Sequence, residues 1–229
     1  MALIVIYGIN AAGKDSVANE LKKKYPNAVF TSESRILMYS LGLITSYDSS
    51  FKVDREAYKQ LENTPQEKMI EIENTKYREL VSKVSRDSGL TILLTHLVFA
   101  LNVDKAKPVY LVDRKIPDFI YQYGSGFIEV VVDPEEILRR RNVGVSLEGR
   151  DRGTLTVEDI NFHQSLCQQR WAELTEKVGL ENTLVVSNNK GELETAVHTV
   201  ENFIESKLLF FLNSFVSINK INILIKKRL

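Results

Sequence analysis

The stretch ALIVIYGINAAGKDS, residues 2–16, decides the fold of this chain. Its first part, Ala2–Tyr7, is a continuous apolar run, which predicts a strand buried on both faces. Gly8 and Gly13 then frame the pattern G-x-x-x-x-G-K, and a segment of helical composition follows Lys14. A buried strand, a glycine-rich turn and a helix in this order indicate a loop that binds phosphate groups.

The residue types of this loop suit a nucleoside triphosphate. The two glycines let backbone N–H groups turn toward the β-phosphate, and the helix adds the positive end of its dipole. Lys14 is placed to bridge the β- and γ-phosphates. A hydroxyl usually follows such a lysine directly to hold Mg²⁺, but Asp15 stands there, so we expect Ser16 to face the metal. The residues predicted to bind ATP with Mg²⁺ are Gly8, Ile9, Asn10, Ala11, Ala12, Gly13, Lys14, Asp15 and Ser16.

Composition limits the classes of protein to which the chain can belong. Its 229 residues, 44% hydrophobic and 26% charged, fit one globular domain with a sizeable core. Thirty basic and thirty acidic residues cancel, so we expect small-molecule nucleotides as partners and neither nucleic acid nor a membrane. The single cysteine, Cys167, excludes an intrachain disulfide framework and indicates a reducing, cytoplasmic location. We interpret the apolar N-terminal run as a strand rather than a signal peptide, because no basic region precedes it.

Short apolar runs alternate with helical segments along the chain. Thr64-Pro65, Asp133-Pro134 and Thr156–Asp159 are typical helix starts, and the alternation predicts right-handed crossovers with helices on both faces of a parallel sheet. The expected fold is therefore a three-layer α/β fold of the P-loop NTPase type. Its five predicted strands are Ala2–Tyr7, Ala28–Phe30, Leu90–Thr95, Phe127–Val132 and Thr183–Ser187.

Three segments lie outside this alternation. Residues 31–76 form a long, mostly helical insertion, which we expect to bind the acceptor of a transferred group. Residues 139–153 are rich in arginine and glycine and are typical of a mobile lid. Within a kinase domain spanning 1–206, these are the two expected subregions. Residues 207–229 form an extension of unknown role, interpreted as an extra helix or strand packed on the domain or on another subunit, with weak membrane contact as the alternative.

Basic side chains in these segments are candidates for contacts with phosphates. Arg139, Arg140 and Arg141 follow Asp133-Pro134 on one predicted helix, and at most two of them can face one site. The alternative, a solvated basic face, has about equal weight. In the insertion and at a strand end, the candidates for acceptor binding are Arg35, Arg55, Lys59 and His96.

Together these features resemble the archaeal-type adenylate kinases, a group of nucleoside monophosphate kinases, over residues 2 to about 205. Beyond the glycine loop, the likeness rests on Thr95-His96, residues 133–141, Arg150-Asp151, Asp159-Ile160, His163-Gln164 and residues 55–61.

The resemblance implies transfer of the γ-phosphoryl group of ATP to AMP. It assigns catalytic roles to Lys14, Arg141 and Arg150, and places Arg55 and Lys59 on the AMP side. Arg140 and Arg152 would belong to the lid. Archaeal-type members often form trimers, so the resemblance leaves self-association open.

Leu94 departs from the family pattern, which has an aspartate just before Thr-His to help order Mg²⁺. The region 142–149 also carries fewer arginines than the family's lid. Two alternatives therefore stay open: a P-loop kinase for another small acceptor, and a nucleotide-binding switch module with weak transfer activity.

Overall fold

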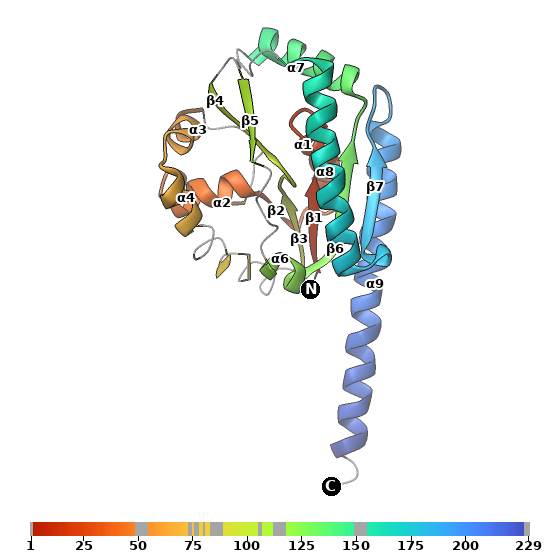
Figure 1. Cartoon of the computed structure of the whole chain (residues 1–229). Coiled ribbons are helices and arrows are strands. Elements are labelled where there is room, and N and C mark those ends of the chain that lie inside the picture. Colours follow the sequence, from red (N-terminus) through yellow and green to blue (C-terminus); the bar gives the residue numbers. More distant parts are fainter. Residues whose placement is uncertain are drawn as a thin grey trace.

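The computed structural model describes residues 2–48, 55–72, 75, 78–79, 81–82, 89–104, 107–111, 118–148 and 155–226 (Figure 1). Its centre is a five-stranded sheet in the order β2-β3-β1-β6-β7, and every pair of neighbours is parallel. This confirms the predicted fold class. The strands are β1 Ala2–Tyr7, β2 Val29–Ser32, β3 Leu90–Leu94, β6 Gly124–Val131 and β7 Thr183–Ser187.

Strand β1 occupies the middle of the sheet, between β3 and β6. All six of its residues are buried, as its unbroken apolar run predicts. Strand β7, at the sheet edge, has Val185 exposed, because only part of it is covered. The five predicted strands are thus confirmed, with end points that differ by up to three residues.

Helices cover both faces of the sheet. On one face lie α1, Lys14–Lys24, and α9, Leu193–Lys226; a Cβ atom added at Gly126 would lie 2.7 Å from Phe203 of α9 and 3.0 Å from Ile4 of β1. On the other face lie α6, Asp118–Tyr123, and α8, Val157–Val178, where Trp171 meets Tyr7 of β1 edge to face with ring centroids 6.2 Å apart. Successive residues of β1 therefore point to different helix layers.

The segment after β2 forms three short helices with a small apolar core of their own. They are α2 Glu33–Ser40, α3 Arg55–Glu62 and α4 Gln66–Ile72. Ser32 caps α2, because its hydroxyl accepts a hydrogen bond from the Arg35 N–H. The shared core contains Leu37, Met38, Ala57, Leu61 and Ile72.

Two elements differ from the sequence-based expectation. An antiparallel hairpin, β4 Phe99–Asp104 with β5 Lys107–Leu111, was not predicted. The loop expected from Arg139 is wrong for residues 139–148, because α7 runs from Pro134 to Glu148. Ion pairs of Glu136 with Arg139 and Arg140, one turn further along, support this helix.

The expected helix starts are confirmed where they can be compared. Thr156 and Asp159 form a capping box at the start of α8, and Pro134 opens α7. The extension after Ser206 continues α9 as a helix to Lys226, and the distal part of this helix projects beyond the sheet in Figure 1. Within the described part of the chain, no helix combines the length and the apolar character that crossing a bilayer requires.

Candidate phosphate-binding site

The loop between β1 and α1 ends in a backbone conformation that favours glycine. Gly13 has φ +86°, in the left-handed region that favours glycine, and a Cβ atom there would lie 2.4 Å from Asn188 Nδ2. A Cβ atom at Gly8 would lie 2.8 Å from the Val130 carbonyl oxygen. The two glycines of the sequence pattern therefore also permit close packing against the end of β6 and against Asn188, which follows β7.

Side chains from α7 and from the end of β7 hold the loop from outside. Asn188 Nδ2 donates to the Ala12 carbonyl at 3.0 Å, and Arg140 Nη1 donates to the same oxygen at 3.2 Å. Arg140 Nη2 also donates to the Asn188 carbonyl at 2.6 Å. Because C=O and the next N–H point in opposite directions across a trans peptide, these bonds aim the Gly13 N–H away from Arg140 and Asn188.

Lys14 is buried at the start of α1 with its ammonium group folded over the loop. Nζ donates to the carbonyls of Gly8 at 2.6 Å and of Ile9 at 3.2 Å. Burial lowers the pKa of Lys14 to about 8, while Asp15 acts in the opposite direction. The ammonium is thus held by weak neutral acceptors, which a phosphate oxygen would replace with a charged partner.

The first turn of α1 is open toward solvent. Gly13 is the N-cap and supplies no side-chain cap, while Asp15 and Ser16 are exposed. The Ser16 hydroxyl suits Mg²⁺, which prefers oxygen donors and retains several water ligands. Among the described residues, no group of three or more His, Cys, Asp or Glu side chains is arranged to hold a metal ion. A magnesium ion here would depend chiefly on phosphate oxygens and water.

Helix α7 contributes a second buried cationic group. Arg141 of α7 is buried, with 9% of its surface exposed, and His163 of α8 is buried as well. Burial lowers the pKa of His163, and the positive charges of Arg141 and Lys14 lower it further. His163 Nε2 lies 3.1 Å from the Val98 carbonyl. Lys14 of α1 and Arg141 of α7 thus both act electrostatically on His163 of α8.

The remaining predicted site residues lie in different settings. Arg35 Nη2 donates to the carbonyl of Ser46 at 3.1 Å, so this arginine is engaged with its own insertion. Lys59 is exposed on α3, and His96 is half-buried just after β3. Arg55 begins α3, and Arg150 and Arg152 lie outside the described residues. The roles assigned to these residues stay predictions.

Three residues that the sequence did not single out belong to the same edge of the sheet. Asn188 supports the loop, Glu33 accepts a hydrogen bond from Thr95, and Glu129 is a buried carboxyl on β6. A lone glutamate inside the apolar run FIEVVV was a usable signal for Glu129. Asn188 and Glu33 carry no such signal, because only the packing of the strands reveals their neighbours.

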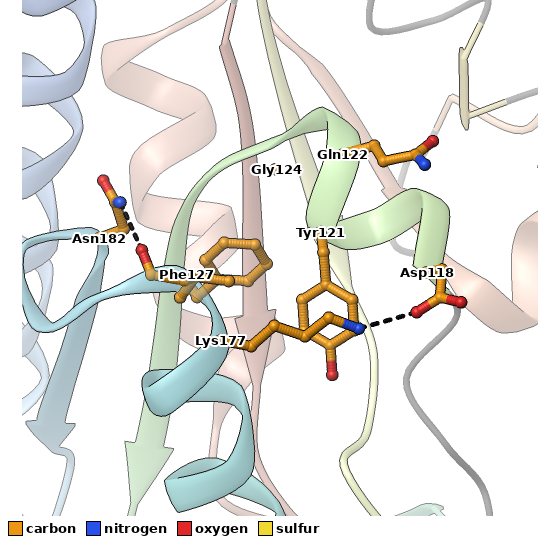
Figure 2. Close-up of a pocket in the computed structure, with 8 residues that line it drawn as sticks. Asp118, Tyr121, Gln122, Gly124, Phe127, Lys177 and Asn182 are labelled. Carbon is orange, nitrogen blue, oxygen red and sulfur yellow. Dashed lines mark hydrogen bonds and ion pairs between the residues drawn. The ribbon is translucent and has the colours of Figure 1, made fainter.

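A separate cavity of about 490 Å³ opens at the other end of the sheet. Figure 2 shows Lys177 reaching toward Asp118, with the two charged atoms 2.8 Å apart, and lying over the ring of Tyr121. Gly124, the first residue of β6, lines it, so the cavity is at the amino edge of the strands. Open α/β sheets bind ligands at the carboxyl edge, and the phosphate loop is there.

Comparisons with known proteins identify the fold. No protein-family model and no curated protein matches the chain. Similar solved structures include shikimate kinase from Bacteroides thetaiotaomicron, with 13% identity, a TM-score of 0.50, and 89% of this chain and 98% of that chain covered. Shikimate kinase from Acinetobacter baumannii in complex with shikimate has 15% identity and a TM-score of 0.48, covering 90% and 94%. The crystal structure of TT1252 from Thermus thermophilus has 18% identity and a TM-score of 0.46, covering 88% and 96%.

The likeness to the Bacteroides structure, together with the all-parallel sheet, shows that this chain has the fold of the P-loop kinases. At this level of identity the likeness extends to the fold alone.

Proposed function

We propose that the chain is a P-loop phosphotransferase that moves the γ-phosphoryl group of ATP to a small acceptor, with AMP as the first candidate. The observation that carries the proposal is the buried ammonium of Lys14, folded over the phosphate loop, with the buried Arg141 as a second cation that acts on the same histidine, His163. Two cations in a site of low polarity suit the charge that spreads over a phosphoryl group during transfer.

Each of these side chains has a role in that reaction. Lys14 exchanges its bonds to the Gly8 and Ile9 carbonyls for phosphate oxygens and follows the charge from the β- to the γ-phosphate. Arg141 stabilises the negative charge of the phosphoryl group during its transfer. Positioning and electrostatics then account for catalysis, with no protein nucleophile. Mg²⁺ would neutralise phosphate charge when bound, with the Ser16 hydroxyl as its protein ligand.

The short helices α2–α4 support an acceptor site next to this centre. They follow β2 at the carboxyl edge of the sheet and have their own apolar core, so they can move as a unit against the sheet. Closure over two nucleotides would exclude water and favour transfer over hydrolysis. Nucleoside monophosphate kinase activity is the proposal that gives a role both to the phosphate loop and to helices α2–α4.

One observation keeps the two alternatives open. Leu94, buried at the end of β3, places an apolar side chain where the family pattern has an acid that orders Mg²⁺. Weak transfer by a nucleotide-binding switch module would fit that change. A P-loop kinase acting on another small acceptor would fit it as well, if other groups position the acceptor.

The decisive experiment is an ADP-release assay with ATP and a panel of acceptors: AMP, GMP, CMP, UMP and phosphorylated sugars. AMP-stimulated ADP formation supports adenylate kinase activity. Stimulation by another acceptor supports a P-loop kinase that acts on that acceptor. ATP binding without ADP formation favours the switch module.

The variant Lys14→Ala tests the role of the Lys14 ammonium group. We expect it to remain folded and to lose about 2.7–4 kcal/mol of transition-state stabilisation, a hundredfold or greater fall in turnover. Near wild-type turnover in this variant would refute the role of Lys14. A folded wild-type protein that does not bind ATP or GTP at millimolar concentration would refute the proposal as a whole.

A further inference from the structure

The cavity of about 490 Å³ at the amino edge of the sheet has no part in the proposed phosphoryl transfer. It is formed where α6, β6, α8 and the 3₁₀ turn Leu180–Asn182 meet. Gly124 lines it, whereas the Val130 carbonyl lies against Gly8 of the phosphate loop, six residues or about 20 Å further along β6. The volume is within the range of small-molecule sites, about 300–1,000 Å³. The chain therefore has room for a second ligand, remote from the phosphate loop.

The residues that line this cavity include one cation and one anion, which are paired with each other. Lys177 Nζ lies 2.8 Å from Asp118 Oδ1, and these side chains are 51% and 84% exposed. The same ammonium lies 3.9 Å from the centroid of the Tyr121 ring (Figure 2). Because an aromatic face attracts a cation, the carboxylate and the ring together form a place for an ammonium group. The protein's own lysine occupies this place.

The charges next to this pair balance each other as well. Burial raises the pKa of the Tyr121 hydroxyl, the negative charges of Asp118 and Glu173 raise it further, and the positive charge of Arg170 lowers it. Glu173 and Arg170 are themselves paired, with 2.7 Å between Arg170 Nη1 and Glu173 Oε2. The charged lining residues and these two neighbours therefore carry no net charge. A ligand that carries charges of both signs preserves this balance.

The inner wall of the cavity is apolar and fixed in place. Phe127 of β6 has 1% of its surface exposed, and Val178 of α8 is half-buried. Asn182, the polar residue beside them, is already engaged. Its Nδ2 donates to the Val178 carbonyl at 2.7 Å, and its Oδ1 accepts a hydrogen bond from Lys207 Nζ at 2.9 Å. This wall therefore suits an apolar group of a ligand.

We propose that the cavity binds a small zwitterion with an apolar side chain, the chemistry of a free α-amino acid. The ligand's ammonium group takes the place of the Lys177 ammonium, between the Asp118 carboxylate and the Tyr121 ring. Its carboxylate pairs with Lys177, whose flexible stem lets the ammonium move aside. Its side chain contacts Phe127 and Val178. Each charge of the existing pair then has a ligand charge of opposite sign beside it.

A ligand with a single charge fits this cavity less well. An amine would displace Lys177 from Asp118 without offering the lysine a new anion. A carboxylate could pair with Lys177 but would have to approach Asp118, which repels it. A zwitterion avoids both penalties, and the exchange of partners itself costs little, because an exposed ion pair contributes little to stability. This inference goes beyond the proposed function and does not depend on it.

The test measures binding of L-phenylalanine to the full chain by titration calorimetry. Three analogues each remove one feature of the ligand. 3-Phenylpropionate lacks the ammonium group, 2-phenylethylamine lacks the carboxylate, and glycine lacks the apolar side chain. We expect phenylalanine to bind at least fivefold more tightly than each of the three.

The variants locate the site. Lys177→Met and Asp118→Asn remove one charge each at exposed positions, and we expect each to weaken phenylalanine binding at least fivefold. The matched control is Lys23→Met, which removes an exposed lysine paired with Glu20 on α1. This control should leave the affinity within twofold, and so should Lys14→Ala, since the phosphate loop is at the other end of β6. Melting temperatures establish that each variant is folded.

Several outcomes would overturn the inference. If phenylalanine does not bind to the wild-type protein at millimolar concentration, the cavity is not an amino-acid site. An analogue with one charge that binds as tightly as phenylalanine would refute recognition of a zwitterion, and glycine binding equally well would refute the role of the apolar wall. Phenylalanine binding that is unchanged in both Lys177→Met and Asp118→Asn, or lost in Lys14→Ala, would place the ligand elsewhere.

The same measurements are independent of the proposed function. Phenylalanine binding in a protein that does not bind ATP would support the cavity and refute the phosphotransferase. ADP formation from ATP and an acceptor, without phenylalanine binding, would support the phosphotransferase and refute the cavity.

Discussion

At the scale of single residues, Gly13 joins the conformation of the phosphate loop to its packing. Its φ of +86° disfavours any side chain, and a Cβ atom would also lie 2.4 Å from Asn188 Nδ2 and 3.2 Å from Arg140 Nη1. Gly42 offers a control, because its φ is +73° but a Cβ atom there meets nothing within 4 Å.

We predict that Gly42→Ala lowers the free energy of unfolding by about 1–2 kcal/mol, the cost of the left-handed conformation alone. Gly13→Ala should lose more, because Asn188 must also move, and should weaken ATP binding. Urea denaturation and ATP titration of both variants measure the difference. Equal losses of stability with unchanged ATP affinity in Gly13→Ala would show that the contact with Asn188 is unimportant.

Glu129 makes the stability of the molecule depend on pH. Burial raises the pKa of its carboxyl from about 4.5 to about 7 in the folded protein. Between these values the folded state binds more protons than the unfolded state, so stability falls as pH rises from about 4.5 to about 7. Glutamine at this position does not titrate and should remove the fall.

We predict that Glu129→Gln unfolds like the wild type near pH 4 and is more stable by up to about 3 kcal/mol at pH 8. Urea denaturation at a series of pH values measures this difference. A difference that does not change with pH would contradict the raised pKa.

At this scale, the sequence identified the residues that act together with their neighbours along the chain. The loop from Gly8 to Ser16 is contiguous, so its pattern identifies it before any tertiary contact is known. Asn188 and Glu33 act through neighbours 176 and 62 residues away, on Ala12 and Thr95. Such pairs depend on strand order and register, which periodicity does not determine.

At the scale of elements, the strands that were predicted are those with a clear pattern within their own segment of sequence. The five strands of the sheet are apolar runs and were found. The hairpin β4–β5 lacks the glycine or asparagine turn that usually identifies one; its strands are joined by Lys105 and Ala106. The start of α7 was recognised from Asp133-Pro134, and Arg139, Arg140 and Arg141 were expected on this helix. Its continuation to Glu148 was not predicted, because the arginines and glycines of residues 139–153 suggested a loop.

Helix α7 supports the phosphate loop through one arginine and not through its neighbour. Arg140 donates to the carbonyls of Ala12 and Asn188, whereas Arg139 pairs only with Glu136 on its own helix among the contacts of the described residues. Substitutions at Arg140 and at Arg139 therefore separate the effect of hydrogen bonds to the phosphate loop from the effect of the positive charge on α7.

We predict that Arg140→Ala weakens ATP binding about tenfold or more, since hydrogen bonds from charged groups contribute about 1.5–3 kcal/mol. Arg139→Ala should leave the affinity within twofold. Calorimetric titration with ATP tests both, and faster hydrogen exchange at residues 9–14 in Arg140→Ala would show the loosened loop. Equal effects of the two substitutions would assign the result to net charge instead.

At the scale of the whole molecule, the contacts of α9 with the domain that the structure describes come from the first half of this helix. The helix has 34 residues, which corresponds to about 51 Å, and its distal part extends away from the sheet in Figure 1. The residues that pack in the core are Ala196, Val197, Val200, Ile204 and, at its margin, Leu208. Lys207 also donates to Asn182 at 2.9 Å, which fixes the helix beside the start of β7.

We predict that a chain ending at Phe210 keeps its fold, with a melting temperature within a few degrees of the full chain and unchanged ATP affinity, because all of these contacts precede the cut. The matched variant is Ile204→Asp in the full chain. It places a charge at a fully buried position and should lower stability by several kcal/mol.

Thermal unfolding, ATP titration and light scattering of the three proteins would then separate domain stability from assembly. A smaller mass for the shortened chain, with its melting temperature retained, would assign self-association to residues 211–229, because no other part of the molecule changes. A shortened chain that fails to fold would show instead that the extension stabilises the domain directly, and that the core of this fold reaches further along α9 than Leu208.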